Sequence, residues 1–240
     1  LTVGEIYDAS AAAIGLDAGK LMGLSSYGSP KFFNKNFVGN WYDNNEFQAS
    51  EWVDYCTKEA KAAGYCLDNF GIKNKITDPV NVDFAASTQK LSEEILLQAS
   101  SSLYESMNKS GLYSQNLCFS GGVALNCPAN TRLFNESKFE SIFIPPAIND
   151  AGLSIGSAYA LYYNHLNNPR LLNKTSPKIA YQGYISSSEI KEEQLSIYEN
   201  KICYTKFQNI EKEIANELNN NNIVALFTGR SEIGPRALCH

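Results

Sequence analysis

Histidine is scarce in this chain. Only two of its 240 residues are histidine, His165 and His240, and they are not spaced as a pair of metal ligands. The six cysteines are scattered and form no Cys-x-x-Cys pair, which argues against a zinc-finger or a thioredoxin-type motif. We therefore interpret His165 as a surface residue, and we expect reduced thiols and a cytoplasmic location.

Clusters of positive charge and long apolar runs are also missing. Lys and Arg total 20 against 25 Asp and Glu, which gives a net charge of -5 with no basic block. This balance argues against a duplex nucleic acid as partner. No apolar run approaches the ~20 residues that span a bilayer, so we expect no membrane segment. The 44% hydrophobic content is nevertheless enough for a buried core.

The hydrophobic pattern predicts alternating strands and helices, and hence an α/β fold. We expect a strand-to-helix region over 1–28. Further predicted helices lie near 50–63, over 82–109, from 149 to 163, from 186 and over 210–218, and predicted strands over 117–119, 141–144, 202–204 and 223–227. The domains we predict are residues 1–165 and 179–240, joined by a polar linker over 166–178.

Residues 29–80 are irregular and rich in aromatic side chains, including Phe32 and Trp52. These rings have two interpretations: they stack on a sugar, or they cover the core. We favour the core.

A glycine pair marks the first candidate site. Ser120, Gly121 and Gly122 follow a predicted strand and precede a helix, with Asn126 four residues further on. Glycines let a phosphate approach the backbone, and a helix N-terminus offers unpaired N–H groups. The alternative is a tight structural turn. A pyrophosphatase-type loop is disfavoured because Ala124 and Leu125 stand where it needs an aspartate and a serine.

Three further sets of charged residues are candidates, each with a structural alternative. Asp150 precedes a helix, where it is either a metal ligand or a simple N-cap. Arg230 and Arg236 lie among glycines in a dense motif and suit an anionic ligand, although Glu232 offers an internal ion pair. Lys20 is either a functional lysine or a solvated surface lysine.

Together these segments resemble the carbamoyltransferase family of the NodU and CmcH type. The matching stretches are Gly19-Lys20-Leu21-Met22-Gly23-Leu24 with Tyr27-Gly28, Phe119 to Asn126, Asn149-Asp150-Ala151-Gly152, and Gly229 to Leu238. The resemblance implies the second half of an actin/hexokinase-like (ribonuclease H-like) domain followed by the start of a YrdC-like domain. It also implies that the chain is an internal piece of a longer protein and is inactive alone.

The resemblance implies a chemistry as well. ATP and carbamoyl phosphate would give a carbamoyl-adenylate, and the carbamoyl group would pass to a hydroxyl of a sugar, an antibiotic or a nodulation-factor-like molecule. Ser120, Gly121, Gly122, Asn126 and Lys20 would contact ATP. Asp150 would bind a divalent metal, Fe²⁺ or the Mg²⁺ that accompanies ATP, and the catalytic residues Arg230 and Arg236 would hold the carbamoyl-phosphate or adenylate anion.

This chain departs from the family pattern at two places. It has no His-x-x-x-His metal pair, and Ala18 stands where an acidic residue usually precedes the Gly-Lys pair.

Two alternative functions stay open: a tRNA threonylcarbamoyl transferase relative and a non-catalytic nucleotide-binding module. A homodimer is one possible assembly of the protein.

Overall fold

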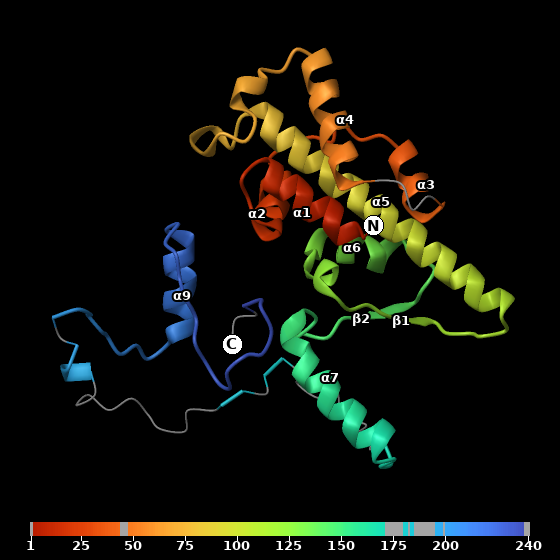
Figure 1. Ribbon diagram of the computed structural model, residues 1–240. Helices are drawn as coiled ribbons and strands as arrows, with labels where there is room; N and C mark the ends of the chain where they lie inside the picture. The colour runs from red at the N-terminus through yellow and green to blue at the C-terminus, as the bar shows by residue number, and fades with distance from the viewer. Residues whose placement is uncertain are drawn as a thin grey trace. The chain divides into compact units, whose positions relative to one another are not determined.

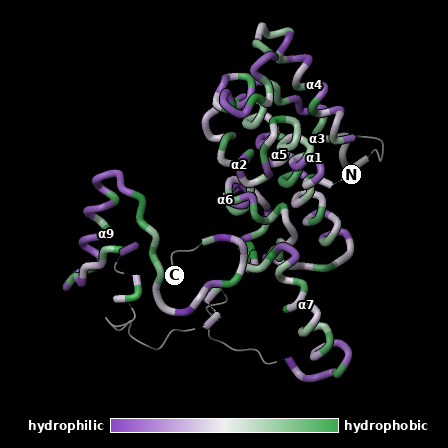
Figure 2. The backbone as a smooth tube through the Cα atoms, turned by 60° about the vertical axis from the view of Figure 1, so that its left-hand side comes forward, coloured by the Kyte–Doolittle hydropathy of each residue, from purple (hydrophilic) through white to green (hydrophobic). Residues whose placement is uncertain are grey.

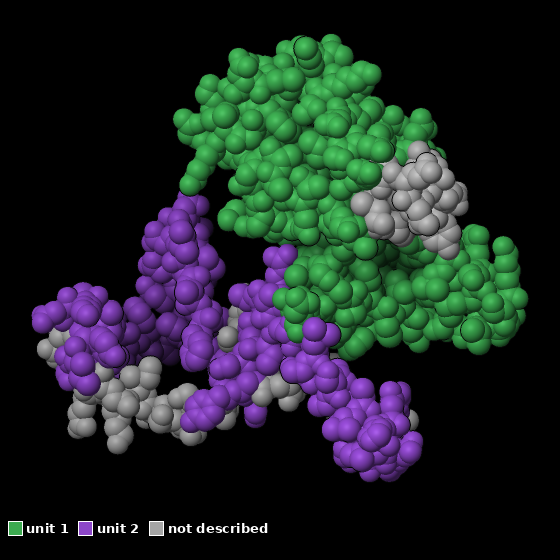
Figure 3. All heavy atoms as spheres, viewed as in Figure 1, with its two compact units in different colours: residues 1–150 green, residues 151–240 purple. Residues whose placement is uncertain are grey.

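The computed structural model describes residues 2–43, 48–170, 180–181, 183–184, 195–198 and 200–237. The chain divides into two compact units, residues 1–150 and 151–240, which are coloured separately in Figure 3. The predicted domain boundaries at 165 and 178 stay a prediction. Among the described helices, none combines the length and the apolar character needed to cross a bilayer.

Helices make up most of the first unit (Figure 1). The α-helices are α1 (Val3–Ala13), α2 (Ala18–Ser25), α3 (Asn36–Asp43), α4 (Ala49–Ala62), α5 (Pro79–Lys109) and α6 (Cys127–Glu136). Short 3₁₀ turns lie between these helices, η1 (Leu67–Asn69), η2 (Lys73–Lys75) and η3 (Gly122–Leu125), and a fourth, η4 (Asp150–Gly152), follows them. The helices predicted near 50–63 and over 82–109 are confirmed as α4 and α5.

The strand predicted at the N-terminal end is wrong. The described residues begin directly with α1, which a capping box starts: Thr2 Oγ accepts from the Glu5 N–H, and the Thr2 N–H donates to the Glu5 carboxylate. A capping box satisfies two of the four N–H groups that a helix start leaves open. The alanine-rich residues that follow are strong helix formers, so local preference favours a helix here.

The 31-residue helix α5 is the element on which the unit is built. Asp78 caps its start and accepts from the Val80 N–H, and Pro79 occupies the first turn, where its missing N–H costs nothing. At the other end Gly111 has a φ of 70°, the left-handed conformation that stops a helix. Helices α1, α2, α3 and α6 all pack against α5.

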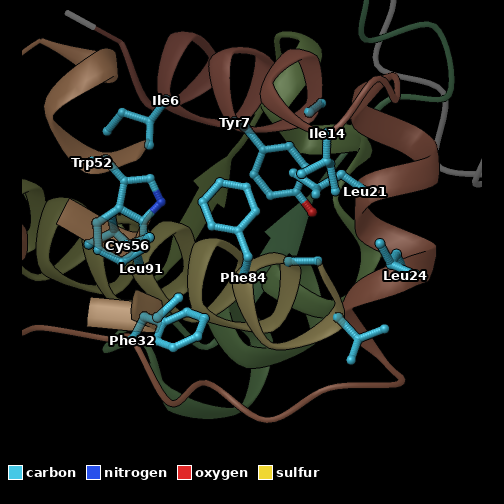
Figure 4. Close-up of a cluster of buried hydrophobic side chains, with 14 of the residues drawn as sticks. Ile6, Tyr7, Ile14, Leu21, Leu24, Phe32, Trp52, Cys56, Phe84 and Leu91 are labelled. Atoms are coloured by element: carbon cyan, nitrogen blue, oxygen red, sulfur yellow. The ribbon is translucent and has the colours of Figure 1, made fainter. Parts of the chain in front are cut away.

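The hydrophobic core lies between α5 and the helices that precede it (Figure 4). Trp52 of α4 is fully buried, and its indole N–H donates to Thr88 Oγ1 at 2.9 Å. Phe32 is also buried and packs edge-on against Tyr65 with ring centroids 5.4 Å apart. The core interpretation of the aromatic segment is therefore confirmed for Phe32 and Trp52.

A loop beginning at Gly28 is fixed to the first turns of α5. A Cβ atom on Gly28 would lie 2.0 Å from the Val82 carbonyl oxygen, so only glycine allows this approach. The Ser29 N–H then donates to Asp83 at 2.8 Å, and the Phe32 N–H donates to Ser87 Oγ at 3.0 Å. The glycine of the Tyr-Gly pair is thus explained by close packing, whereas Tyr27 is exposed.

Asp83 is the buried charge under that loop. Its carboxylate accepts from Tyr65 Oη at 2.6 Å and from Lys31 Nζ at 2.9 Å. Burial by itself raises the pKa of Asp83, but the hydrogen bonds from the Ser29 N–H, Tyr65 and Lys31 outweigh it and hold the pKa below its ordinary value. The charge is therefore satisfied by hydrogen bonds in the native state.

The sheet consists of β1 (Asn116–Cys118) and β2 (Ser141–Phe143), which pair in parallel with Leu117 opposite Ile142. Parallel neighbours need a crossover, and η3 with α6 supplies it. The fold is therefore a helix-rich α/β arrangement with a two-stranded parallel sheet, which confirms the predicted class at this level.

In the second unit two of the predicted helices are confirmed, and the predicted strands are absent from the described residues. Its described elements are α7 (Leu153–Tyr159), the π-helical turn η5 (Ala160–His165) and α9 (Ile210–Asn219). Residues 202–204 and 223–227 form no strand, although the second stretch is visibly apolar after α9 in Figure 2. Ile223 and Phe227 are exposed there, so no burial stabilises a strand. The helix predicted from Ser186, and residues 171–178 of the predicted linker, lie outside the described residues.

Candidate functional site

Two loops meet where β1 and β2 end. Because the strands are parallel, the segments that follow Cys118 and Phe143 leave the same edge of the sheet. The Phe119 N–H donates to the Phe143 carbonyl at 3.0 Å, and the Gly121 N–H donates to the Ile148 carbonyl at 3.0 Å. The structure thus brings the glycine pair beside the loop that leads to Asp150, as expected at the carboxyl ends of parallel strands.

The glycine pair has two different properties. Gly121 has φ 99° and ψ 166°, a backbone region open essentially only to glycine. Gly122 faces open space, since a Cβ added there would meet no atom within 4 Å. Among the described residues, the N–H groups of Gly122 and Val123 have no acceptor. The loop therefore exposes backbone donors, as the phosphate interpretation requires.

The helix after this loop differs from the prediction. A 3₁₀ turn, η3, stands between the glycine pair and α6. At the N-terminus of α6, Asn126 Oδ1 accepts from the Ala129 N–H at 3.1 Å, and Pro128 has no N–H. The cap thus satisfies one N–H of the first turn, and phosphate binding at this helix terminus stays a prediction.

Asn126 is also held from the other side. Its side chain forms a reciprocal amide pair with Gln89 of α5: Asn126 Nδ2 donates to Gln89 Oε1 at 2.9 Å, and Gln89 Nε2 donates to Asn126 Oδ1 at 3.0 Å. Asn126 is 8% exposed and Gln89 6%. The predicted ATP contact of Asn126 stays a prediction, but its amide already has protein partners at both ends.

Sequence reasoning missed the polar network around this pair. Tyr7 of α1 donates from its hydroxyl to Gln89 Oε1 at 2.7 Å, and Gln89 Nε2 donates to Glu93 at 2.8 Å. Burial raises the pKa of the Tyr7 hydroxyl, which keeps it a neutral donor. One signal was available: Gln89 is a polar residue on a helix whose neighbouring positions follow an apolar stripe.

Arg132 of α6 closes the network at its outer end. It makes ion pairs to Glu93 at 3.1 Å, Glu94 at 2.9 Å and Glu136 at 2.7 Å. The hydrogen bond with Glu136 is the largest effect that raises the pKa of Arg132, and Arg132 in turn holds the pKa of Glu136 below its ordinary value. The network joins α1, α5 and α6 behind the glycine loop.

Asp150 lies at the start of η4 and is exposed. It does not cap α7, whose N-cap is Gly152 without a side-chain hydrogen bond, so the N-cap alternative is wrong for that helix. Within the described ranges, no group of three or more His, Cys, Asp or Glu side chains is placed to hold a metal ion. One carboxylate suits a hard divalent cation but supplies fewer ligands than a metal centre needs.

Lys20 lies on α2 and pairs with Asp17 of the same helix at 2.6 Å. Asp17 is the N-cap of α2 and accepts from the Lys20 N–H at 2.9 Å. The Lys20 side chain is 71% exposed, so this surface pair contributes little to stability. The ATP contact of Lys20 stays a prediction.

The arginine motif belongs to residues 151–240. Arg230 Nε donates to the Gly183 carbonyl at 3.1 Å, and the Ser231 N–H donates to the Tyr184 carbonyl at 2.9 Å. Gly229 and Gly234 both have positive φ, 63° and 100°, which explains why glycine flanks the motif. Arg236 follows the second of these turns.

Comparison with known proteins places the chain in a family. Residues 2–159 match the family described as "Carbamoyltransferase N-terminus", and the chain belongs to this family. The match includes the glycine loop and Asp150 but not the arginine motif.

Relatives extend the likeness over most of the chain. The chain is 33% identical over 232 residues to "Uncharacterized protein sll1178" of Synechocystis sp., covering 91% of this chain and 36% of that protein. It is 27% identical over 228 residues to "Nodulation protein NolO" of Bradyrhizobium diazoefficiens, covering 92% and 38%. It is 30% identical over 128 residues to "Nodulation protein U" of Sinorhizobium fredii, covering 52% and 20%. The chain thus spans less than two fifths of the length of these relatives.

Proposed function

We propose that the chain is part of an ATP-dependent O-carbamoyltransferase that carbamoylates a hydroxyl of a small molecule. The observation that carries the proposal is the family match over residues 2–159, which includes both loops at the carboxyl edge of the sheet. The relatives named as nodulation proteins support a small-molecule acceptor. On this proposal the chain comprises part of an actin/hexokinase-like domain and the start of a YrdC-like domain.

The reaction proceeds in three balanced steps. Carbamoyl phosphate and water give carbamate and inorganic phosphate, and a carbamate oxygen attacks the α-phosphorus of ATP. A P–O bond forms to the carbamate, the P–O bond to the β-phosphate breaks, and pyrophosphate leaves. The acceptor oxygen then attacks the carbamoyl carbon, the C–O bond to AMP breaks, and the hydroxyl proton leaves to a base or to solvent.

The residues have distinct roles in this proposal. Ser120, Gly121 and Gly122 lie along the nucleotide phosphate, and the N–H groups of Gly122 and Val123 are the donors that bind it, since the Gly121 N–H already donates to the Ile148 carbonyl. Arg230 and Arg236 hold the carbamoyl-phosphate or adenylate anion through their planar guanidinium groups. When bound, a divalent metal would supply Lewis-acid charge, and Asp150 is the residue that we propose as its ligand.

The test follows pyrophosphate release by the full-length protein with ATP and labelled carbamoyl phosphate. We expect release to require carbamoyl phosphate, to be lost with Arg230→Ala, and to persist with Asp150→Ala, which should instead lose transfer to the acceptor. Losing a donor to developing phosphoryl charge typically costs about 10²–10³ in rate.

Matched variants control for nonspecific damage. Arg170→Ala removes an exposed arginine outside the motif, and Asp8→Ala removes an exposed aspartate of α1. Both should retain wild-type release and transfer. No release by the wild-type protein under any condition would contradict adenylation and favour a non-catalytic nucleotide-binding module.

A further inference from the structure

Gln89 and Asn126 form a buried, hydrogen-bonded pair next to the glycine loop. Asn126 ends η3 and starts α6, so its position fixes where the loop leaves for the helix. The Asn126 N–H donates to the Val123 carbonyl at 3.0 Å, which closes the turn on itself. Any rotation of this residue therefore moves the turn that carries the exposed N–H groups.

The orientation of both amides is fixed by groups that cannot reverse. At one end the Ala129 N–H can only donate, so the atom of Asn126 facing it is the oxygen. At the other end the Glu93 carboxylate, held by Arg132, accepts from Gln89, so the atom of Gln89 facing it is the nitrogen. Gln89 Oε1 then accepts from both Tyr7 and Asn126.

The loop needs such an external support. Two adjacent glycines leave the backbone more freedom than any other pair of residues, and ordering them costs entropy. The structure supplies two anchors, the Ile148 carbonyl on the Gly121 N–H and Gln89 on Asn126. A third contact comes from the core, against which the partly buried Val123 side chain packs.

We propose that Gln89 is a positioning residue for the nucleotide: supported by Tyr7 and Glu93, it holds Asn126 so that the Gly121–Gly122 loop is ordered before phosphate arrives. The inference rests on the proposed function, because it assumes that this loop binds ATP. Gln89 itself touches no ligand and acts only through Asn126. A preordered loop binds more tightly because less entropy is lost on binding.

The experiment compares nucleotide affinity with stability in the full-length protein. Gln89→Leu keeps the side-chain size but removes all four hydrogen bonds of the amide. We expect about tenfold weaker binding of a non-hydrolysable ATP analogue, since one net hydrogen bond corresponds to roughly that factor. Amide hydrogen exchange over 120–126 should accelerate without nucleotide. The matched control is Gln98→Leu, an exposed glutamine of the same helix.

A double-mutant cycle separates positioning from mere stability. Asn126→Asp keeps the oxygen that caps α6 but removes the donor to Gln89, so its effect on ATP affinity should not add to that of Gln89→Leu. If Gln89→Leu does not fold, Tyr7→Phe removes only one donor and should weaken binding about threefold.

The outcomes are distinct. A wild-type protein that binds no ATP overturns the proposed function and this inference with it. Normal wild-type binding, with Gln89→Leu or Tyr7→Phe lowering Tm but leaving affinity and loop exchange unchanged, overturns only the inference.

Discussion

The two units differ in what holds their elements in place. All residues that the structure describes as buried belong to residues 1–150, from Val3 to Ile148. In the described part of residues 151–240, Tyr159, Ile223 and Phe227 are exposed instead. The first unit is therefore specified by long-range packing, and the described elements of the second unit by local interactions.

The helix α9 and residues 223–227 show what this difference means. A helix satisfies its hydrogen bonds within its own segment, and Asn209 completes the start of α9 by accepting from the Lys212 N–H. A strand requires a neighbour for its N–H and C=O groups. Among the described residues, 223–227 have no such neighbour, so an apolar pattern that predicts a strand is not enough to make one.

The largest expected effect is the loss of the core tryptophan. Trp52→Ala removes a fully buried ring that packs edge-on against Phe37 and leaves Thr88 without its donor. We expect a loss of about 3–5 kcal/mol in the free energy of unfolding, measured by urea denaturation. Ile223→Ala, in the second unit, should stay within about 0.5 kcal/mol. Equal effects of the two substitutions would contradict the comparison.

The next effect comes from close backbone packing. Gly28→Ala places a methyl group 2.0 Å from the Val82 carbonyl oxygen, so the loop or α5 must move. We expect a loss of about 1–3 kcal/mol in the free energy of unfolding, read from the denaturation midpoint. Gly23→Ala is the control, because nothing lies within 4 Å of a Cβ added in that helix. A stable Gly28→Ala variant would refute the tight contact.

Acid should weaken the first unit through Asp83. Its folded-state pKa lies below the ordinary 3.8, so below about pH 5 the unfolded chain increasingly binds more protons than the native state. The stabilisation is complete above the unfolded pKa and is lost as the pH falls through the folded one. The free energy of unfolding, followed by urea titration at pH 3–6, should fall with pH. Asp83→Asn should flatten only part of this slope, since the pKa values of Glu94 and Glu136 are also lowered.

The smallest effect is local to the second unit. Asn209→Ala removes the cap of α9 and should cost about 0.5–2 kcal/mol of helix stability. Amide exchange within α9 should accelerate while unfolding of the first unit is unchanged. Asn216→Ala, in the interior of the same helix, should have the opposite effect because alanine is the better helix former. A change in the first unit would show that the two units are coupled.

Sequence reasoning recovered the features that local rules determine. The hydrophobic pattern predicted the helix over 82–109, which is α5. The alternation of strands and helices predicted the α/β class, and it placed the glycine pair directly after a strand. These succeed because caps, periodicity and turn residues act over a few positions.

The polar network could not be predicted in the same way. Tyr7 and Gln89 are 82 residues apart, and Gln89 and Asn126 are 37 apart. No local pattern links such positions, because helix packing alone brings them together. The strand predicted near the N-terminal end was also wrong, because Thr2 and Glu5 form a capping box that starts α1 there.

The reciprocal amide pair also constrains which substitutions can accumulate at these two positions during evolution. Each amide serves the other as both donor and acceptor, so a change at Gln89 leaves unmet groups on Asn126 and a change at Asn126 leaves them on Gln89. Single replacements should therefore be rare among related chains, while paired replacements of complementary size and polarity should persist. Residues 89 and 126 are expected to covary in an alignment of homologues, and residue 7 should covary with them less strictly.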